Sequence, residues 1–182
     1  MAVVIAVSRS GRHTFTKLNE PSIWLIEGSG VDGDAHAGIT VRHRYALKKC
    51  PRPAPPNLRQ VHLMHAELFD ELSTEGFEVW PGALGENITT RGIDLLGLPQ
   101  DTLLHLGKMA IVKLTGLRTP CRQMDKFAAG LAKAVMTRAS QKKEKLSRAG
   151  VLAVVIKGGQ VEPGNEIEVE LPSGVPRALR HI

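Results

Sequence analysis

Short apolar segments that end in glycine-containing turns follow one another along most of this chain. The stretches AVVIAVSRS (2–10) and SIWLIEG (22–28) are rich in the β-branched and apolar residues that strands prefer. The stretch DTLLHLGKMAIVKLTG (101–116) predicts two further strands, joined by a tight turn at Gly107 and Lys108. A chain of this kind is therefore expected to fold mainly as β-sheet.

The C-terminal part repeats the pattern. AGVLAVVIKGG (149–159) predicts one strand, and QVEPGNEIEVELP (160–172) predicts a partner that begins after a turn at Pro163-Gly164. Only two or three helices are indicated elsewhere. We therefore expect a mainly β fold (β-rich α+β), a β-barrel with a few peripheral helices rather than an alternating α/β sheet.

Two segments have helical periodicity. HAELFDELSTEG (65–76) predicts a helix that Gly76 ends. The apolar positions that form one face of this helix are Met64, Leu68, Phe69 and Leu72. A second helix is expected after Cys121, weakened by Gly130. Its apolar positions are Phe127, Leu131 and Val135.

Three segments do not fit regular structure. GSGVDGDAHAG (28–38) contains so much glycine that it predicts a loop. KKCPRPAPPN (48–57) predicts an extended, proline-rich insertion without a core of its own. The tail, 172–182, is expected to be loosely held. We expect the whole chain to form a single domain, 1–182, with its core at about 20–171.

Length and composition suit one soluble domain. The chain has 182 residues, of which 42% are hydrophobic and 23% charged. The N-terminal apolar run is too short for a signal peptide, and no stretch is long enough to span a membrane. We therefore expect a cytoplasmic protein that does not bind membranes.

The net charge of +6 favours an anionic partner. Aromatic residues make up only 4% of the chain, which leaves few rings for stacking on bases, so nucleic acid is an unlikely partner. The two cysteines, Cys50 and Cys121, predict neither a disulfide nor a structural zinc site, because no histidine is spaced around them as a zinc motif requires.

Cys121 has a distinctive setting in TGLRTPCRQMDKF (115–127). Pro120 disfavours helix before it, so Cys121 is expected at the point where a strand ends and a helix begins. The helix amides together with Arg118 and Arg122 would stabilise a thiolate there, which could attack, carry sulfur or bind a metal. The alternative is a small buried apolar residue, as most free cysteines are.

Five motifs occur in a characteristic order. They are GDAHAG (33–38), RQVHLM (59–64), PGALGENI (81–88), GLRTPC (116–121) and GVLAVVIKGGQVEPGNEIEV (150–169). Together they resemble the MOSC domain, named for its place at the C-terminus of molybdenum cofactor sulfurases, over roughly residues 20–171. The resemblance implies a barrel-like β fold. It also implies a cysteine that carries sulfur as a persulfide or ligates molybdenum in a bound pterin cofactor.

The resemblance also assigns residues. Cys121 matches the family cysteine and would be the catalytic residue and the metal ligand. The cofactor-binding positions that match family motifs are Arg118 beside it, Asp34 and His36 in the glycine-rich loop, and Glu86 and Asn87 in the GEN turn. Each of these two pairs of residues also has a purely structural interpretation. Asp34 and His36 could cap a turn, and Glu86 and Asn87 could bond their own backbone.

Arginine forks would hold the phosphate of the pterin. The candidates are Arg42, Arg44, Arg59 and Arg118, of which only Arg118 lies in a motif. Other residues have a simpler interpretation. His62 and His65 suit packing and capping better than metal binding, His105 suits a core position, and Cys50 suits an incidental thiol.

Two mechanisms remain open at this point. Cys121 could ligate molybdenum in a protein that reduces N-hydroxylated compounds with electrons from a partner protein, or it could relay persulfide sulfur in the maturation of metal–sulfur centres. We expect no desulfurase domain before the motifs, so pyridoxal phosphate would enter only through a separate cysteine-desulfurase partner. The alternative from another class is a non-catalytic module that binds an anionic ligand or nucleic acid.

Overall fold

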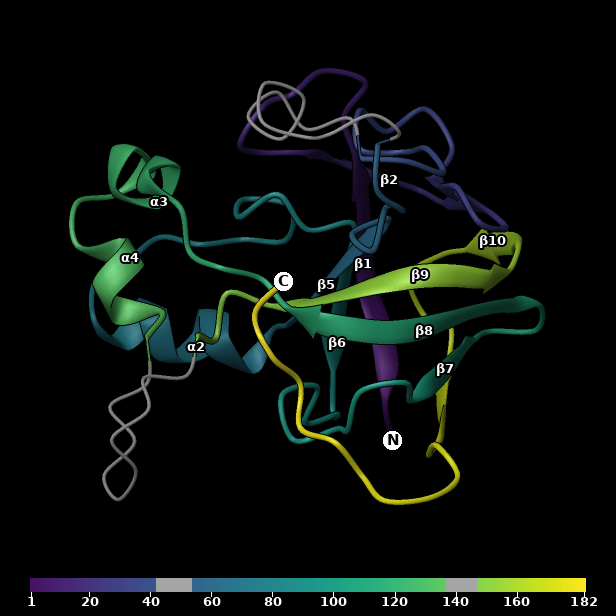
Figure 1. The fold of residues 1–182 in the computed structure, drawn as a ribbon. Coiled ribbons are helices and arrows are strands. Elements are labelled where there is room, and N and C mark those ends of the chain that lie inside the picture. The colour runs from purple at the N-terminus through teal and green to yellow at the C-terminus, as the bar shows by residue number, and fades with distance from the viewer. Residues whose placement is uncertain (42–53, 137–146) are drawn as a thin grey trace.

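The computed structural model describes residues 1–41, 54–136 and 147–182, and within these ranges it is dominated by strands (Figure 1). One sheet has eight strands in the order β11-β7-β8-β9-β5-β6-β1-β2, and a second has three in the order β10-β3-β4. The strands are β1 (Val3–Arg9), β2 (Leu18–Glu20), β3 (Ile23–Ile26), β4 (Gly30–Val31), β5 (Val61–His65), β6 (Ile88–Arg91), β7 (Leu103–Leu106), β8 (Ala110–Leu117), β9 (Val151–Lys157), β10 (Gly159–Val161) and β11 (Ile167–Glu170). The helices are α2 (Glu67–Thr74), α3 (Arg122–Phe127) and α4 (Leu131–Ala134).

This architecture confirms the β-rich fold with peripheral helices but corrects the closed barrel. The large sheet is open, because no ladder joins its edge strand β11 to β1. A single antiparallel bridge between Val3 and Glu166 connects the two, with Ile167 N–H donating to the Ala2 carbonyl at 3.0 Å. The chain leaves the turn at Pro163-Gly164 beside β1 and then pairs with β7, so the contact ends after a few residues.

The strand pair β5–β6 is parallel, although the neighbouring pairs β5–β9 and β1–β6 are antiparallel. A parallel pair needs a crossover connection, and α2 lies in it. Because the two strands begin at the same edge of the sheet, His62 and Asn87 become neighbours there: Asn87 N–H donates to the His62 carbonyl at 2.8 Å. This edge carries the candidate site.

Two apolar clusters hold the elements together. The larger is enclosed by the strands and contains Leu25, Leu63, Ile88 and Leu114. The smaller packs helices against the other side of β5; its fully buried members include Met64, Leu68, Leu72, Met124 and Leu131. Met64 was expected on the helix but belongs to β5, and it still faces the same cluster as the helix residues.

The helix expected after Cys121 forms as two pieces. Cys121 is the N-cap of α3 in an extended conformation, as predicted, and α4 follows. Between them Gly130 adopts a φ of 87°, which favours glycine and interrupts the helix. No helix in the described part of the chain is both long and apolar enough to cross a membrane.

The C-terminal tail is held more firmly than expected. Ala178 bridges to Pro99, His181 bridges in parallel to Leu117, and Leu179 is buried. The absence of a side chain on Gly116 allows this approach, since a Cβ there would lie 2.6 Å from the Arg180 carbonyl oxygen. The two bridges and the buried side chain of Leu179 together dock the tail.

The predicted insertion, 48–57, is described only from residue 54. Its last residue, Asn57, is buried and donates through Nδ2 to the carbonyls of His36 (2.9 Å) and Gly38 (3.0 Å). This end of the insertion is therefore fixed to the glycine-rich loop. Residues 48–53, with Cys50, lie outside the described residues, as do Arg42 and Arg44.

Candidate functional site

Four segments meet at the edge where β5 and β6 begin. They are the loop after β1 (10–17), the glycine-rich loop after β4 (32–38), the turn before β6 (82–87) and the segment from β8 to α3 (118–121) (Figure 1). Polar side chains from each of these segments connect to one another. The structure thus brings together motifs that lie far apart in the sequence.

Asp34 anchors the glycine-rich loop from a fully buried carboxylate. Oδ1 accepts hydrogen bonds from the His36 backbone N–H at 2.9 Å and from the His36 ring at 3.2 Å. Oδ2 accepts from the Lys17 ammonium at 2.7 Å and from the Asn87 amide at 3.0 Å. Burial raises the pKa of Asp34, but the hydrogen bonds from His36 and the charge of Lys17 outweigh it and hold the pKa well below its usual range.

Lys17 is the cation that sequence reasoning missed. Its side chain is buried with 3% exposed, and its ammonium pairs with Asp34. Burial lowers the pKa of Lys17, and the attraction of Asp34 opposes this without reversing it. A lysine in a short polar loop carries no local signal that would have distinguished it from a solvated residue.

Asn87 links the turn before β6 to the glycine-rich loop and to strands β1 and β5. Its Nδ2 donates to the Ser8 carbonyl (3.1 Å) as well as to Asp34, and its Oδ1 accepts from the His62 backbone N–H at 3.2 Å. The amide therefore has a partner for both donors and for its acceptor. Asn87 does form hydrogen bonds with backbone groups, as in the structural alternative, and its amide also positions the Asp34 carboxylate.

Glu86 is completely buried and closes the turn before β6. Oε1 accepts from the Gly82 N–H at 2.6 Å and from the Thr89 hydroxyl at 3.2 Å, while Oε2 accepts from the Leu84 N–H at 3.1 Å. Burial raises the pKa of Glu86, and these donors reduce the effect. The geometry favours the structural alternative for Glu86, because both of its oxygens are used within the turn.

Arg118 lies between this turn and Cys121. Its Nη1 donates to the Leu84 carbonyl at 2.7 Å, and its guanidinium stacks over the Phe15 ring at 5.9 Å from the centroid. Burial lowers the pKa of Arg118, and the negative charge of Glu86 opposes this. The guanidinium is thus held against the turn before β6, and Arg118 precedes Cys121 by three residues in the chain.

Cys121 itself is half-buried at the start of α3 and is the free cysteine in the described part of the chain. Its Sγ lies 3.7 Å from Gln123 Oε1, a weak contact with an exposed side chain. The thiol is therefore not the fully buried apolar residue of the alternative interpretation. It is partly accessible at the surface.

Two other predicted residues lie around this centre. Arg59 is on the exposed loop before β5, and its backbone N–H donates to Asn57 Oδ1 at 3.0 Å, which ties it to the residue that bonds the glycine-rich loop. His36 is partly exposed and meets His13 edge-to-face with ring centroids 5.2 Å apart. All the described candidates therefore belong to one region, with Asp34 and Glu86 as its buried supports.

The remaining histidines are structural or peripheral. His62 is buried, and its Nε2 bonds the Ala149 carbonyl at 2.9 Å. Burial, reinforced by the positive charge of Arg118, holds the pKa of His62 well below its usual value, so the ring is neutral. His105 was expected in the core, but it lies at the surface of β7 and pairs with Glu170 across the β7–β11 ladder at 2.8 Å.

A model of the MOSC domain family matches residues 40–168 of the chain. This protein belongs to the MOSC family. The match covers the GEN turn and the cysteine motif, and the family is associated with molybdenum cofactor sulfurase.

Solved structures share the fold of this MOSC protein. The YuaD protein from Bacillus subtilis is 22% identical with a TM-score of 0.77, over 95% of this chain and 98% of that one. YiiM from Geobacillus stearothermophilus is 15% identical with a TM-score of 0.68, over 98% and 80% of the two chains. YiiM from Escherichia coli is 17% identical with a TM-score of 0.62, over 96% and 73%. A search of curated proteins found no match.

Proposed function

We propose that Cys121 provides the thiolate ligand for molybdenum in a bound pterin cofactor, and that the protein reduces N-hydroxylated compounds with electrons from a partner protein. The observation that carries the proposal is a half-exposed cysteine at the start of α3, three residues after an arginine whose guanidinium is fixed on the Leu84 carbonyl. Membership of the MOSC family gives this arrangement its context.

The donor set of this region fits such a cofactor. No group of three histidine, cysteine or acidic residues in the described ranges is arranged to hold a bare metal ion. A metal that arrives with the sulfur ligands of its own cofactor needs only one more soft donor, and a cysteine thiolate is the soft ligand that proteins supply. Cys121 meets that requirement.

The positive groups suit the phosphate of the cofactor. The Lys17 ammonium pairs with the Asp34 carboxylate at 2.7 Å, so its charge is neutralised within the protein. Arg59 is exposed, and Arg118 uses one of its N–H groups on the Leu84 carbonyl. Arginine binds phosphate through its fork of N–H donors, so these two side chains would hold the anionic end.

The reaction consumes two electrons and two protons: R–NHOH + 2 e⁻ + 2 H⁺ gives R–NH₂ + H₂O. A bound molybdenum centre supplies the two-electron chemistry. In this scheme His36 would supply a proton, because Asp34 contacts its Nδ1 and the ring is partly exposed. Asp34 orients the imidazole in the way that a carboxylate orients a catalytic histidine.

Relay of persulfide sulfur is the second candidate. It is favoured by the exposure of Cys121 at a helix start, where a partner protein can reach Sγ without opening the core. In that case the electron-donor protein is replaced by a cysteine desulfurase that carries its own pyridoxal phosphate. Both candidate functions depend on Cys121 Sγ. They differ in whether the purified protein retains molybdenum or carries only sulfur.

The test compares wild type, Cys121→Ser and the matched control Cys50→Ser, each purified from a host that makes the cofactor. We expect molybdenum in wild type and in the control, and loss of it in Cys121→Ser with little change in melting temperature, because serine is close in size but supplies no thiolate. If no protein retains molybdenum and only the two that keep Cys121 release sulfide on reduction after loading by a desulfurase, the relay is favoured. Full metal and sulfur loading of Cys121→Ser would contradict both.

A further inference from the structure

The helix α3 is attached to the rest of the protein by one buried side chain. Of its six residues Met124 is the buried one, and it packs in the smaller apolar cluster. Asp125 is used on the following helix, because its Oδ1 accepts from the Ala132 N–H at 3.0 Å. Figure 1 shows α3 at the edge of the molecule, apart from the strands. Most of this helix is therefore free to contact another molecule.

The two cations of α3 lie on the side of the helix that faces away from the core. Successive residues of an α-helix are rotated by about 100°, so the residues two positions before and two positions after Met124 project to the side opposite to it. These residues are Arg122 and Lys126, which are exposed and share one face because they are four residues apart. Within the described ranges neither of them forms an ion pair. Two positive charges thus face solvent without a counter-charge.

Cys121 lies at one end of α3 and an exposed tryptophan packs at the other. Cys121 is the N-cap of the helix and is half-buried. Phe127, the last residue of the helix, packs against Trp80 with ring centroids 5.6 Å apart, and Trp80 is still 50% exposed. A tryptophan supported by a second ring is typical of the apolar anchors of protein interfaces. A helix of this length spans about 9 Å, so all these groups fit within one interface of about 800 Å² per partner.

The charges indicate the chemistry of the partner. The basic residues of 118–136 are Arg118, Arg122, Lys126 and Lys133, and the acidic residue is Asp125. Such a surface attracts a protein with an acidic patch, and exposed charges of this kind act mainly on the rate of encounter. Nucleic acid suits the surface less well, because α3 and α4 contain a single aromatic residue, and single-strand binding stacks bases on a succession of rings.

We propose that α3 and Trp80 form the docking surface for an acidic electron-transfer protein. Arg122 and Lys126 pair with carboxylates of that protein, and Trp80 packs against the centre of its contact patch. Docking there brings the redox group of the partner toward Cys121. A one-electron carrier docks twice for each N-hydroxylated compound, because the reduction consumes two electrons. The identity of the partner as an electron donor rests on the proposed function.

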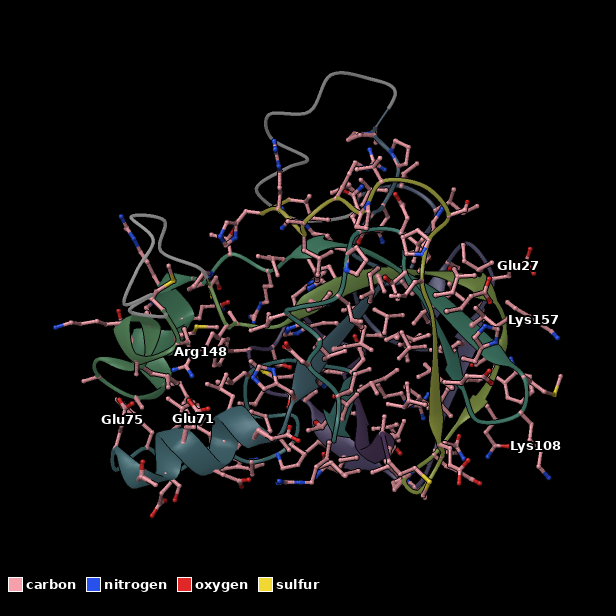
Figure 2. All side chains as sticks on the ribbon, turned by 90° about the horizontal axis from the view of Figure 1, so that it is seen from below. Glu27, Glu71, Glu75, Lys108, Arg148 and Lys157 are labelled. Carbon is pink, nitrogen blue, oxygen red and sulfur yellow. The ribbon has the colours of Figure 1, made fainter. Side chains whose placement is uncertain are left out.

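The probe is a flavodoxin of strongly negative net charge, and calorimetry at about 50 mM salt measures its affinity, because low salt leaves surface charges poorly screened. The test variant combines Arg122→Glu with Lys126→Glu. The matched control combines Lys108→Glu with Lys157→Glu, which changes the net charge equally at exposed lysines that Figure 2 shows far from the green ribbon of α3 and α4. We expect binding to weaken at least about tenfold in the test variant and less than about twofold in the control.

The two tryptophans of the chain test the apolar anchor. Trp80 and Trp24 are 50% and 52% exposed, and Trp24 lies on β3. We expect Trp80→Ala to weaken flavodoxin binding severalfold and Trp24→Ala to leave it unchanged, with no loss of melting temperature in either. No binding of flavodoxin to wild type up to about 0.5 mM, or equal losses in the two double variants, would overturn the proposal.

The same measurements separate this proposal from its alternatives. Calorimetry does not require molybdenum, so flavodoxin binding by a protein that retains no molybdenum would support the docking surface and contradict the proposed function. A protein that contains molybdenum but does not bind flavodoxin would contradict the docking surface alone. A single-stranded DNA of about 20 nucleotides that binds more tightly than flavodoxin, and that the Arg122→Glu and Lys126→Glu pair weakens, would identify a nucleic-acid surface and overturn the proposal.

Discussion

Asp34 shows how a single side chain organises this protein. Its two oxygens accept from the Lys17 ammonium, the Asn87 amide, and the ring and backbone of His36, so three separate segments depend on one carboxylate. Charged groups in the interior are tolerated only when paired in this way. The residue therefore has a structural role whatever chemistry takes place at Cys121.

Asp34→Asn should be strongly destabilising. The change leaves the Lys17 ammonium buried without its counter-charge, and breaking a buried pair in this way costs about 3–5 kcal/mol. Urea unfolding followed by fluorescence measures the change. Asp70→Asn is the matched control, since it removes one partner of the exposed Arg91–Asp70 pair, and we expect it to have little effect. Equal effects of the two substitutions would show that the Asp34 pair is not a buried support.

His62 makes stability depend on pH. Its pKa in the folded protein lies well below the usual value of about 6.5, so the unfolded chain binds more protons between the two values. The free energy of unfolding should therefore fall as pH drops below about 6.5, by up to about 1.4 kcal/mol per pH unit from this residue. The measurement is urea unfolding of wild type and His62→Gln at several values between pH 5 and 7.5.

The comparison between these two proteins isolates His62 from other groups. Glu86 acts in the opposite direction. Its pKa is raised in the folded protein, so above about pH 4.5 the folded chain binds more protons at this residue than the unfolded chain does, and its contribution to the free energy of unfolding is lost as pH rises. Glu86 is present in both proteins and cancels in the difference. If the variant shows the same pH slope as wild type, His62 is not the cause.

At the scale of single elements, the C-terminal tail behaves as part of the fold. Leu179 is 6% exposed, whereas Val175 in the same tail is 91% exposed. Leu179→Ala should therefore lower the free energy of unfolding by about 2–3 kcal/mol, the lower part of the range for a buried leucine, because the cluster lies close to the surface. Val175→Ala should change the free energy of unfolding by only a few tenths of a kcal/mol. Chemical denaturation distinguishes a docked tail from a loosely held one.

Gly130 tests the break between α3 and α4. A Cβ at this position would meet only Phe77 at 3.9 Å, so Gly130→Ala adds no steric clash. The cost comes from the φ of 87°, and we expect a loss of about 1 kcal/mol in the free energy of unfolding. A stabilising effect would mean that the two helices can merge into the single helix that the sequence predicts.

At the scale of the whole molecule, we expect the net charge of +6 to give only weak, non-specific binding to nucleic acid. Five cations in the described part of the chain are paired with acids; the pairs are Arg9–Glu20, Lys17–Asp34, Arg91–Asp70, Arg148–Glu71 and Arg177–Asp101. We therefore predict weak retention on a polyanion column that is lost at about 0.15 M salt, and no sequence preference for DNA in a mobility-shift assay. Tight binding that survives such salt would favour the binding-module alternative.

The parts of the structure that followed from sequence are those with local signals. Alternation and β-branched residues predicted strands such as β1 and β8, and the proline before Cys121 predicted the start of a helix there. The parallel pair β5–β6, the Lys17–Asp34 pair and the docking of Leu179 were not predictable. Each depends on a contact between distant segments, and nothing in the residues around Lys17 or Leu179 indicates the partner.

The docking of the tail has a practical consequence for anyone who attaches a label to this protein. Ile182 N–H donates to the carbonyl of Leu117, the residue directly before Arg118, so a fluorophore or affinity tag joined there would begin beside the cysteine region. The N-terminal residue Met1 comes just before β1 and lies beside Gly92. Figure 1 marks the two chain ends at separate places. A tag at the N-terminus is expected to leave the region around Cys121 uncovered, whereas one at the C-terminus would begin close to it.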